Sequence, residues 1–115
     1  MKFGYIGLGN MGGAIAKRML LSQELIVFDL SEKIRSEFSK LGAQTASSVE
    51  EIGAATDVIF LCLPTSNDVR EVIFGSSGLL STMKNGIICD MTTGDPVLTR
   101  QMADELPTGI SLVDA

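Results

Sequence analysis

Six short runs of mainly apolar residues recur along the chain, and longer stretches with helical spacing of apolar positions separate them. One run, Leu25-Ile26-Val27-Phe28, is apolar without interruption, which is typical of a parallel strand buried on both faces of a sheet. The runs therefore predict six strands. These strands are expected at residues 2–6, 25–28, 43–46, 57–63, 86–90 and 110–113.

The stretches between the runs predict helices, because they have helical spacing of apolar positions and most of them start with a capping residue. The expected helices are 13–21, 32–40, one from Ser47 or Ser48 to Ala55, one from Asn67 or Asp68 to Phe74, 79–83 and 96–106. Strands that alternate with helices predict an α/β fold. We expect one doubly wound domain over residues 1–115, built on a mainly parallel six-stranded sheet.

The stretch between the first predicted strand and the first helix reads Gly7-Leu8-Gly9-Asn10-Met11-Gly12. In this context the G-x-G-x-x-G pattern predicts a Rossmann-type turn that binds the pyrophosphate of a dinucleotide. Gly7 would permit the tight turn, Gly9 would let phosphates approach the backbone, and Gly12 would let the helix pack on the strand. Free N–H groups at the helix start would point at the phosphates. Met11 is expected to pack beneath the turn.

Asp29 ends the second predicted strand, at the distance from the glycine turn where dinucleotide-binding proteins carry an acidic residue. A carboxylate there accepts hydrogen bonds from the adenosine ribose and repels a 2′-phosphate, so the sequence favours NAD over NADP. The alternative is an ordinary turn residue. NADP remains an alternative, because Lys33 and Arg35 could bind its 2′-phosphate, although Leu30 rather than an arginine follows Asp29.

Two later loops are expected at the same edge of the sheet, because they also follow parallel strands. Leu63-Pro64-Thr65 follows the fourth predicted strand and would border the cofactor. The alternative is that Pro64 only terminates the strand. The hydroxyls of residues 92–93, after the fifth strand, would lie toward the nicotinamide. Asp95, which precedes Pro96, is interpreted as a helix cap.

The composition argues against several other classes of function. The net charge is −5 and the basic residues are scattered, which argues against a nucleic-acid partner. No apolar run approaches the roughly 20 residues of a membrane span, so we expect no membrane partner and a cytoplasmic location. The chain has no histidine, which excludes a nucleophilic triad. Cys62 and Cys89 are expected to be buried thiols. No metal site is predicted, because the chain has no histidine and two lone cysteines do not make a ligand set.

Taken together, the motifs resemble those of the β-hydroxyacid dehydrogenase family, which includes 3-hydroxyisobutyrate dehydrogenase, tartronate semialdehyde reductase and, more distantly, 6-phosphogluconate dehydrogenase. The resemblance covers essentially the whole chain. It rests on the glycine turn, Asp29, Leu63-Pro64-Thr65-Ser66, Asp90-Met91-Thr92-Thr93 and the closing Leu112-Val113-Asp114-Ala115, in the right order. Two departures, Arg18 and the short turn Ser22-Gln23-Glu24, lie away from the expected cofactor edge.

The resemblance implies the NAD-binding domain of an oxidoreductase that transfers hydride between NAD and a small β-hydroxy acid. It implies contacts of Asp29 with the ribose and of Thr93 with the region near the nicotinamide. The implied cofactor-binding residues are Gly7, Leu8, Gly9, Asn10, Met11, Gly12, Asp29, Leu63, Pro64, Asp68 and Thr93.

In the family, the motif that matches Asp114-Ala115 continues into P-V-S-G-G, which binds the substrate, and a lysine of a separate helical domain is the general acid/base. Neither is present in the sequence, so we expect a cofactor domain without catalytic residues and without activity of its own. The alternative is a stand-alone module that senses or carries NAD. Apolar residues near Val113 are expected to be exposed, which leaves homo-oligomerisation open.

Overall fold

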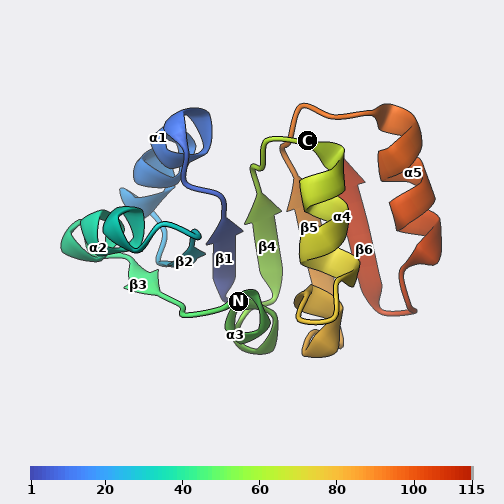
Figure 1. Cartoon of the computed structure of the whole chain (residues 1–115). Helices are drawn as coiled ribbons and strands as arrows, with labels where there is room; N and C mark the ends of the chain where they lie inside the picture. The colour runs from blue at the N-terminus through green and yellow to red at the C-terminus, as the bar shows by residue number, and fades with distance from the viewer. Residues whose placement is uncertain (115) are drawn as a thin grey trace.

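The centre of the molecule is a six-stranded sheet in which every pairing of strands is parallel (Figure 1). This is a computed structural model that describes residues 1–114, so Ala115 of the closing motif lies outside the described residues. The strands lie in the order β3-β2-β1-β4-β5-β6, which confirms the predicted Rossmann-type sheet. Their bounds are β1 Phe3–Ile6, β2 Leu25–Phe28, β3 Gln44–Thr45, β4 Val58–Leu61, β5 Gly86–Asp90 and β6 Ile110–Asp114.

Helices connect consecutive strands, as the sequence predicted. Their bounds are α1 Asn10–Leu20, α2 Glu32–Lys40, α3 Val49–Ala55, α4 Ser66–Phe74, the short 3₁₀-helix η1 Leu79–Ser81 and α5 Pro96–Glu105. Two starts differ from the prediction. α1 begins at Asn10 rather than Gly13, because Gly9 serves as its N-cap. α4 begins at Ser66, because Thr65 rather than Asn67 or Asp68 is its N-cap.

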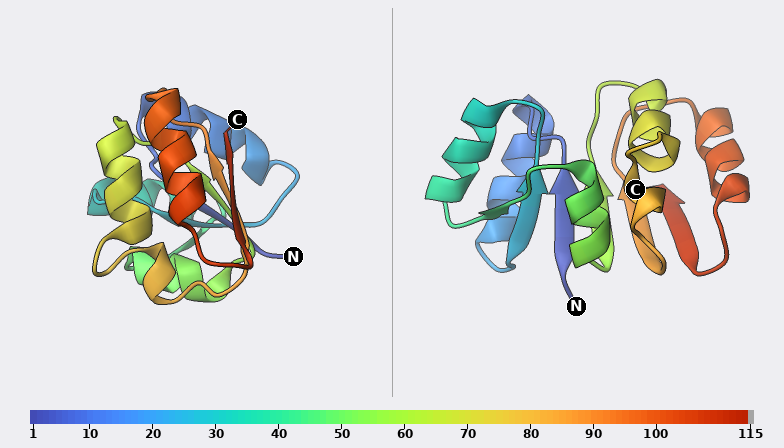
Figure 2. Two further views of the ribbon diagram at one scale, coloured as in Figure 1. Left: turned by 90° about the vertical axis from the view of Figure 1, so that its right-hand side faces the viewer. Right: turned by 60° about the horizontal axis from the view of Figure 1, so that its bottom comes forward.

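The helices cover both faces of the sheet and form two separate cores. Ile73 of α4 and Met102 of α5 are fully or almost fully buried in one core, which α3 also joins. Ala16 of α1, Phe38 of α2 and Tyr5 of β1 are buried in the other. Figure 2 shows α4 and α5 on one side of the sheet and α1 on the other. The doubly wound arrangement is therefore confirmed.

The direction of winding reverses between β1 and β4, which are neighbours in the sheet although α1 to α3 lie between them in the sequence. Ile6 of β1 is in register with both Phe28 of β2 and Leu61 of β4. The loops that follow these three strands therefore leave the sheet side by side. Ligands of open α/β sheets bind at this kind of edge.

One face of the β5–β6 edge carries exposed apolar side chains. Ile87 of β5 is 41% exposed and Val113 of β6 is 46% exposed. Because Cys89 is in register with Val113, Ile87 and Val113 lie on the same face of the sheet. The predicted exposure of apolar residues near Val113 is confirmed.

Candidate functional site

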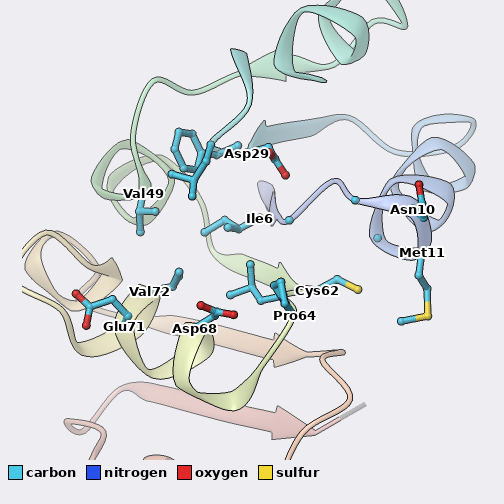
Figure 3. A pocket seen from close by; sticks show the side chains of 16 residues that line it. Ile6, Asn10, Met11, Asp29, Val49, Cys62, Pro64, Asp68, Glu71 and Val72 are labelled. Atoms are coloured by element: carbon cyan, nitrogen blue, oxygen red, sulfur yellow. The ribbon is translucent and has the colours of Figure 1, made fainter. Parts of the chain in front are cut away.

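A cleft of about 590 Å³ opens where β1, β2 and β4 end, between α1 and α4 (Figure 3). Its walls come from the glycine turn, the end of β2, the loop after β4 and one face of α4. The structure brings together most residues that the sequence analysis singled out. The predicted residues that line it are Gly7, Gly9, Asn10, Met11, Gly12, Asp29, Leu63, Pro64 and Asp68.

Gly7 and Gly12 allow the turn to pack tightly against β4. Gly7 has a φ of +100°, and a Cβ atom there would overlap with the backbone oxygen of Cys62. A Cβ atom on Gly12 would overlap with the backbone oxygen of Gly7. Gly9 is different, because no heavy atom beyond its own and those of its two chain neighbours lies within 4 Å of the position that its Cβ would take. The backbone at Gly9 is therefore open to a ligand in the cleft.

α1 differs from the other four α-helices of residues 1–114 because no side chain caps its N-terminus. The side chains that cap α2, α3, α4 and α5 are Ser31, Ser48, Thr65 and Asp95. At α1 the N-cap is Gly9, and the N–H groups of residues 10–12 have no acceptor within the described part of the chain. Unpaired N–H groups and the positive end of the helix dipole favour a phosphate at this position.

Asp29 follows β2, and two backbone N–H groups hold its carboxylate. Oδ2 accepts a hydrogen bond from the N–H of Leu8 at 2.8 Å, and Oδ1 accepts one from the N–H of Ser31 at 2.9 Å. Each oxygen can still accept a further hydrogen bond. Asp29 therefore braces the glycine turn and can also accept hydrogen bonds from hydroxyl groups of a ligand.

Arg35 of α2 contacts the loop of Asp29 from outside the cleft. Its Nη1 donates to the carbonyl oxygen of Asp29 at 2.7 Å and to that of Leu30 at 3.4 Å. The guanidinium also lies over the ring of Phe28, 5.6 Å from its centroid. These contacts orient the guanidinium toward the backbone. The charged side chains that do line the cleft are all acidic: Asp29, Asp68 and Glu71.

Asp68 has a structural role in addition to its place on the cleft wall. Its Oδ2 accepts hydrogen bonds from the backbone N–H of Thr65 at 3.1 Å and from the Thr65 hydroxyl at 2.9 Å. The hydroxyl oxygen of Thr65 in turn accepts from the N–H of Asp68, which completes a capping box. This capping box fixes the start of α4 beside Pro64.

Three predicted site residues lie in unexpected places. The side chain of Leu8 is 4% exposed and packs in the core of α1 and α2, so only its backbone belongs to the turn. Thr93 is exposed in the loop before α5 and is not one of the residues that line the cleft. The prediction that Met11 packs beneath the turn is wrong. Met11 is 56% exposed at the cleft, because Gly12 and Gly13 occupy the inward positions of the first turn of α1.

Several residues of the cleft wall were not predicted from the sequence. These are Ile6, Phe28, Leu30, Val49, Cys62, Glu71 and Val72. Four of them adjoin predicted residues at strand ends. Glu71 and Val72 follow Asp68 by three and four positions, so helical spacing alone would have placed them on the same face. Val49 gave no local signal, since it belongs to α3 of the crossover between β3 and β4.

Both cysteines are half-buried rather than fully buried as expected. Burial raises the pKa of the Cys62 thiol, and the nearby Asp90 raises it further. Burial also raises the pKa of the Cys89 thiol, with further contributions from Asp90 and Asp114. Both thiols are therefore protonated at neutral pH and are weak nucleophiles. Cys62 lines the cleft, whereas Cys89 lies in β5 outside it.

Within residues 1–114, no group of three or more histidine, cysteine, aspartate or glutamate side chains lies together in a way that could hold a metal ion. None of the helices in this range is long and apolar enough to cross a membrane.

Comparison with known proteins supports the geometry. Residues 2–115 match the family model of the NAD binding domain of 6-phosphogluconate dehydrogenase. Mitochondrial 3-hydroxyisobutyrate dehydrogenase of Mus musculus is 37% identical over 105 residues, which cover 90% of this chain and 31% of that protein. 2-(Hydroxymethyl)glutarate dehydrogenase of Eubacterium barkeri is 37% identical over 118 residues, which cover 100% of this chain and 39% of that protein. The chain thus spans about a third of the length of these relatives.

Solved structures of similar fold have been obtained with either cofactor. Psf3 in complex with NADP⁺ and 2-OPP superimposes with a TM-score of 0.89 at 27% identity, over 96% of this chain and 40% of that one. An imine reductase of Myxococcus stipitatus with NADP⁺ has a TM-score of 0.88 at 22% identity, over 99% and 40% of the two chains. A variant of the latter with NAD⁺ has a TM-score of 0.85 at 24% identity, over 98% and 39%. At these low identities the imine reductases support the fold alone.

Proposed function

Because the chain belongs to the family of the NAD-binding domain of 6-phosphogluconate dehydrogenase, we propose that its cleft binds NAD with the pyrophosphate at the N-terminus of α1. The observation that carries this proposal is the uncapped start of α1. The N–H groups of residues 10–12 lack acceptors within the described residues, and the space over Gly9 is open. A pyrophosphate would supply the missing acceptors.

The remaining contacts follow from this placement. Asp29 would accept hydrogen bonds from the ribose of the adenosine half. Val49 and Val72, farther from the glycine turn, would contact the adenine ring (Figure 3). The nicotinamide half would extend the other way, past Met11 and Pro64. We also propose that Thr93 contacts the cofactor near the nicotinamide. Its side chain is exposed in the loop before α5, so it is accessible to a ligand.

We propose NAD rather than NADP as the preferred cofactor. The 2′-hydroxyl of the adenosine ribose would lie at Asp29, and a phosphate there would meet a carboxylate. Asp68 and Glu71 add negative charge to the same cleft. Arg35, one of the two cations that the sequence left as candidates for the 2′-phosphate, donates to backbone carbonyls instead. A 2′-phosphate would therefore find repulsion and no freely oriented arginine.

The chemistry of the whole protein is proposed from its relatives. The named relatives are dehydrogenases of small hydroxy acids. We propose that residues 1–115 are the cofactor domain of such an oxidoreductase, in which hydride passes between NAD and the hydroxyl-bearing carbon of a small β-hydroxy acid. No residue of this chain is proposed as catalytic. The alternative of a stand-alone NAD-sensing module has less support, because the named relatives are enzymes.

Calorimetric titration of the wild-type chain and of Asp29→Ala with NAD and NADP tests the proposal. We expect wild type to bind NAD with micromolar or weaker affinity and to bind NADP less tightly. Asp29→Ala should weaken NAD by about tenfold, the value of one charge-assisted hydrogen bond, and should weaken NADP less. Asp57→Ala is a matched control, because Asp57 is exposed and its carboxylate accepts, within residues 1–114, only from the N–H of Lys2.

Two results would count against the proposal. If the wild-type chain gave no heat of binding with NAD up to millimolar concentrations, the cleft would not be a cofactor site. If Asp29→Ala lost NAD and NADP affinity equally, Asp29 would only brace the Leu8 and Ser31 backbone, and its proposed role in cofactor choice would be wrong.

A further inference from the structure

The loops after β4 and β5 remain attached to each other beyond the ends of the strands. The N–H of Leu63 donates to the hydroxyl oxygen of Thr92 at 2.9 Å, and the N–H of Asp95 donates to that of Ser66 at 2.8 Å. Each pair is separated by 29 residues, the same offset that pairs Val58 with Ile87 in the sheet. The register of β4 and β5 therefore continues into the two loops.

At Leu63 a side-chain acceptor replaces the backbone acceptor that a regular parallel sheet would provide. The N–H of Met91 donates to the carbonyl oxygen of Leu61 at 2.8 Å, as parallel strands require. A regular ladder would next pair the N–H of Leu63 with the carbonyl of Met91. Instead, the N–H of Leu63 donates to the Thr92 hydroxyl. The side chain of Thr92 therefore continues the hydrogen bonding between the two strands one pair beyond the sheet, to Leu63 in the wall of the cleft.

Thr92 is itself held in place. Its side chain is buried, with 8% exposure, and its backbone N–H donates to Oδ1 of Asp90 at 2.9 Å. Asp90 is 3% exposed at the end of β5. A buried hydroxyl on a fixed backbone has few alternative partners, so the bond to Leu63 is expected to persist in solution.

We infer that Thr92 is a positioning residue for the cofactor, which sets the place of the Leu63–Pro64 wall on the nicotinamide side of the cleft. The inference rests on the proposed function, because it assumes NAD in the cleft. The side chain of Thr92 acts from behind the wall through the N–H of Leu63. This role differs from that of the exposed Thr93, which is proposed as a direct contact.

Thr92→Val and Thr92→Ser test the inference. Valine keeps the shape of threonine but leaves the N–H of Leu63 without its acceptor, whereas serine keeps the hydroxyl. We expect Thr92→Val to raise the Kd for NAD about tenfold and to leave the Kd for ADP roughly unchanged, because ADP lacks the nicotinamide half. Thr92→Ser should restore NAD affinity. Thr45→Val, in the exposed edge strand β3, is the matched control.

Amide hydrogen exchange of Leu63, measured by NMR, provides a readout that needs no ligand. The Leu63 amide should be protected in wild type and in Thr92→Ser, and should exchange faster in Thr92→Val. Rapid exchange in wild type would overturn the inference without any variant. The inference would also be overturned if Thr92→Val kept the Leu63 protection and the NAD affinity of wild type. It would be overturned as well if Thr92→Val lost NAD and ADP affinity equally, because that result would indicate general loosening of the fold. Failure of wild type to bind NAD would overturn the proposed function, and Leu63 exchange would still decide whether Thr92 holds the loop.

Discussion

Asp29 combines two roles in one carboxylate. Its oxygens accept hydrogen bonds from the backbone at Leu8 and Ser31, and they remain able to accept from a ligand. The backbone bonds orient the carboxylate before the cofactor arrives, so little side-chain entropy is lost on binding. Arg35 supports the same loop through the carbonyl of Asp29. The residue that we propose distinguishes NAD from NADP is thereby part of the structure that holds the glycine turn.

The two half-buried cysteines offer an internal comparison at the residue scale. Bound NAD should protect Cys62 from alkylation by iodoacetamide, because Cys62 lines the cleft, and should leave the rate at Cys89 unchanged. At an NAD concentration roughly ten times Kd, we expect Cys62 to react about tenfold more slowly. Since burial raises the pKa of both thiols, both rates should still be rising with pH above 8 to 9, the range where a free cysteine titrates.

Mass spectrometry of Cys62→Ser and Cys89→Ser, each with one remaining thiol, measures the two rates separately. Protection of Cys89 equal to that of Cys62 would indicate a general tightening of the fold. Lack of protection at Cys62 would contradict the placement of NAD over the loop after β4.

The element that most directly links fold and binding is the strand–turn–helix unit of β1 and α1. Gly12 allows α1 to approach β1 and β4, and Gly9 leaves the proposed phosphate site open. We therefore expect the pattern to contain one glycine that the fold needs and another that the ligand needs. A pair of alanine substitutions can separate these roles.

Gly12→Ala should lower the free energy of unfolding by about 1–3 kcal/mol, because its Cβ would overlap with the backbone oxygen of Gly7. Gly9→Ala should change it by no more than about 0.5 kcal/mol, because φ is −65° and the space is empty. Both variants should bind NAD more weakly. Urea unfolding measures the stability difference, and equal destabilisation by the two substitutions would contradict this division of roles.

The sheet and the glycine turn could be predicted because their signals are local. A buried strand followed by G-x-G-x-x-G has one common structural solution, and apolar runs between helical stretches predict parallel strands whose following loops lie at one edge of the sheet. Asp29, Leu63 and Pro64 were found because each ends or follows a strand of this sheet. In the structure, all three residues line the same cleft.

Other features could not be predicted because they depend on contacts between distant segments. Met11 was expected under the turn. Gly12 was correctly expected to face the strand, but no local pattern shows that Gly13 is inward as well and that Met11 is left on the exposed side of α1. Thr65 is the N-cap of α4, but the nearby Asn67 and Asp68 are equally good N-cap residues by type, so the sequence does not show which of the three starts the helix. The bond from Leu63 to Thr92 requires the register of β4 and β5, which no local pattern contains.

At the scale of the whole molecule, the chain is a cofactor domain that spans about a third of its curated relatives. We expect the 115 residues alone to show no turnover of 3-hydroxyisobutyrate with NAD, since the family's substrate motif and acid/base lysine are absent from this sequence. Absorbance of NADH at saturating NAD measures this directly. Steady NADH production by the purified chain would contradict the expectation and would require a catalytic group among residues 1–115.

The most direct test of the central claim is the calorimetric titration of wild type and Gly9→Ala with NAD, alongside their melting temperatures. We predict that wild type binds NAD with micromolar or weaker affinity, and that Gly9→Ala binds at least about tenfold more weakly, with a melting temperature within about 3 °C of wild type. Equal NAD affinity in the two proteins, or no binding by wild type at millimolar NAD, would contradict a pyrophosphate site at the start of α1.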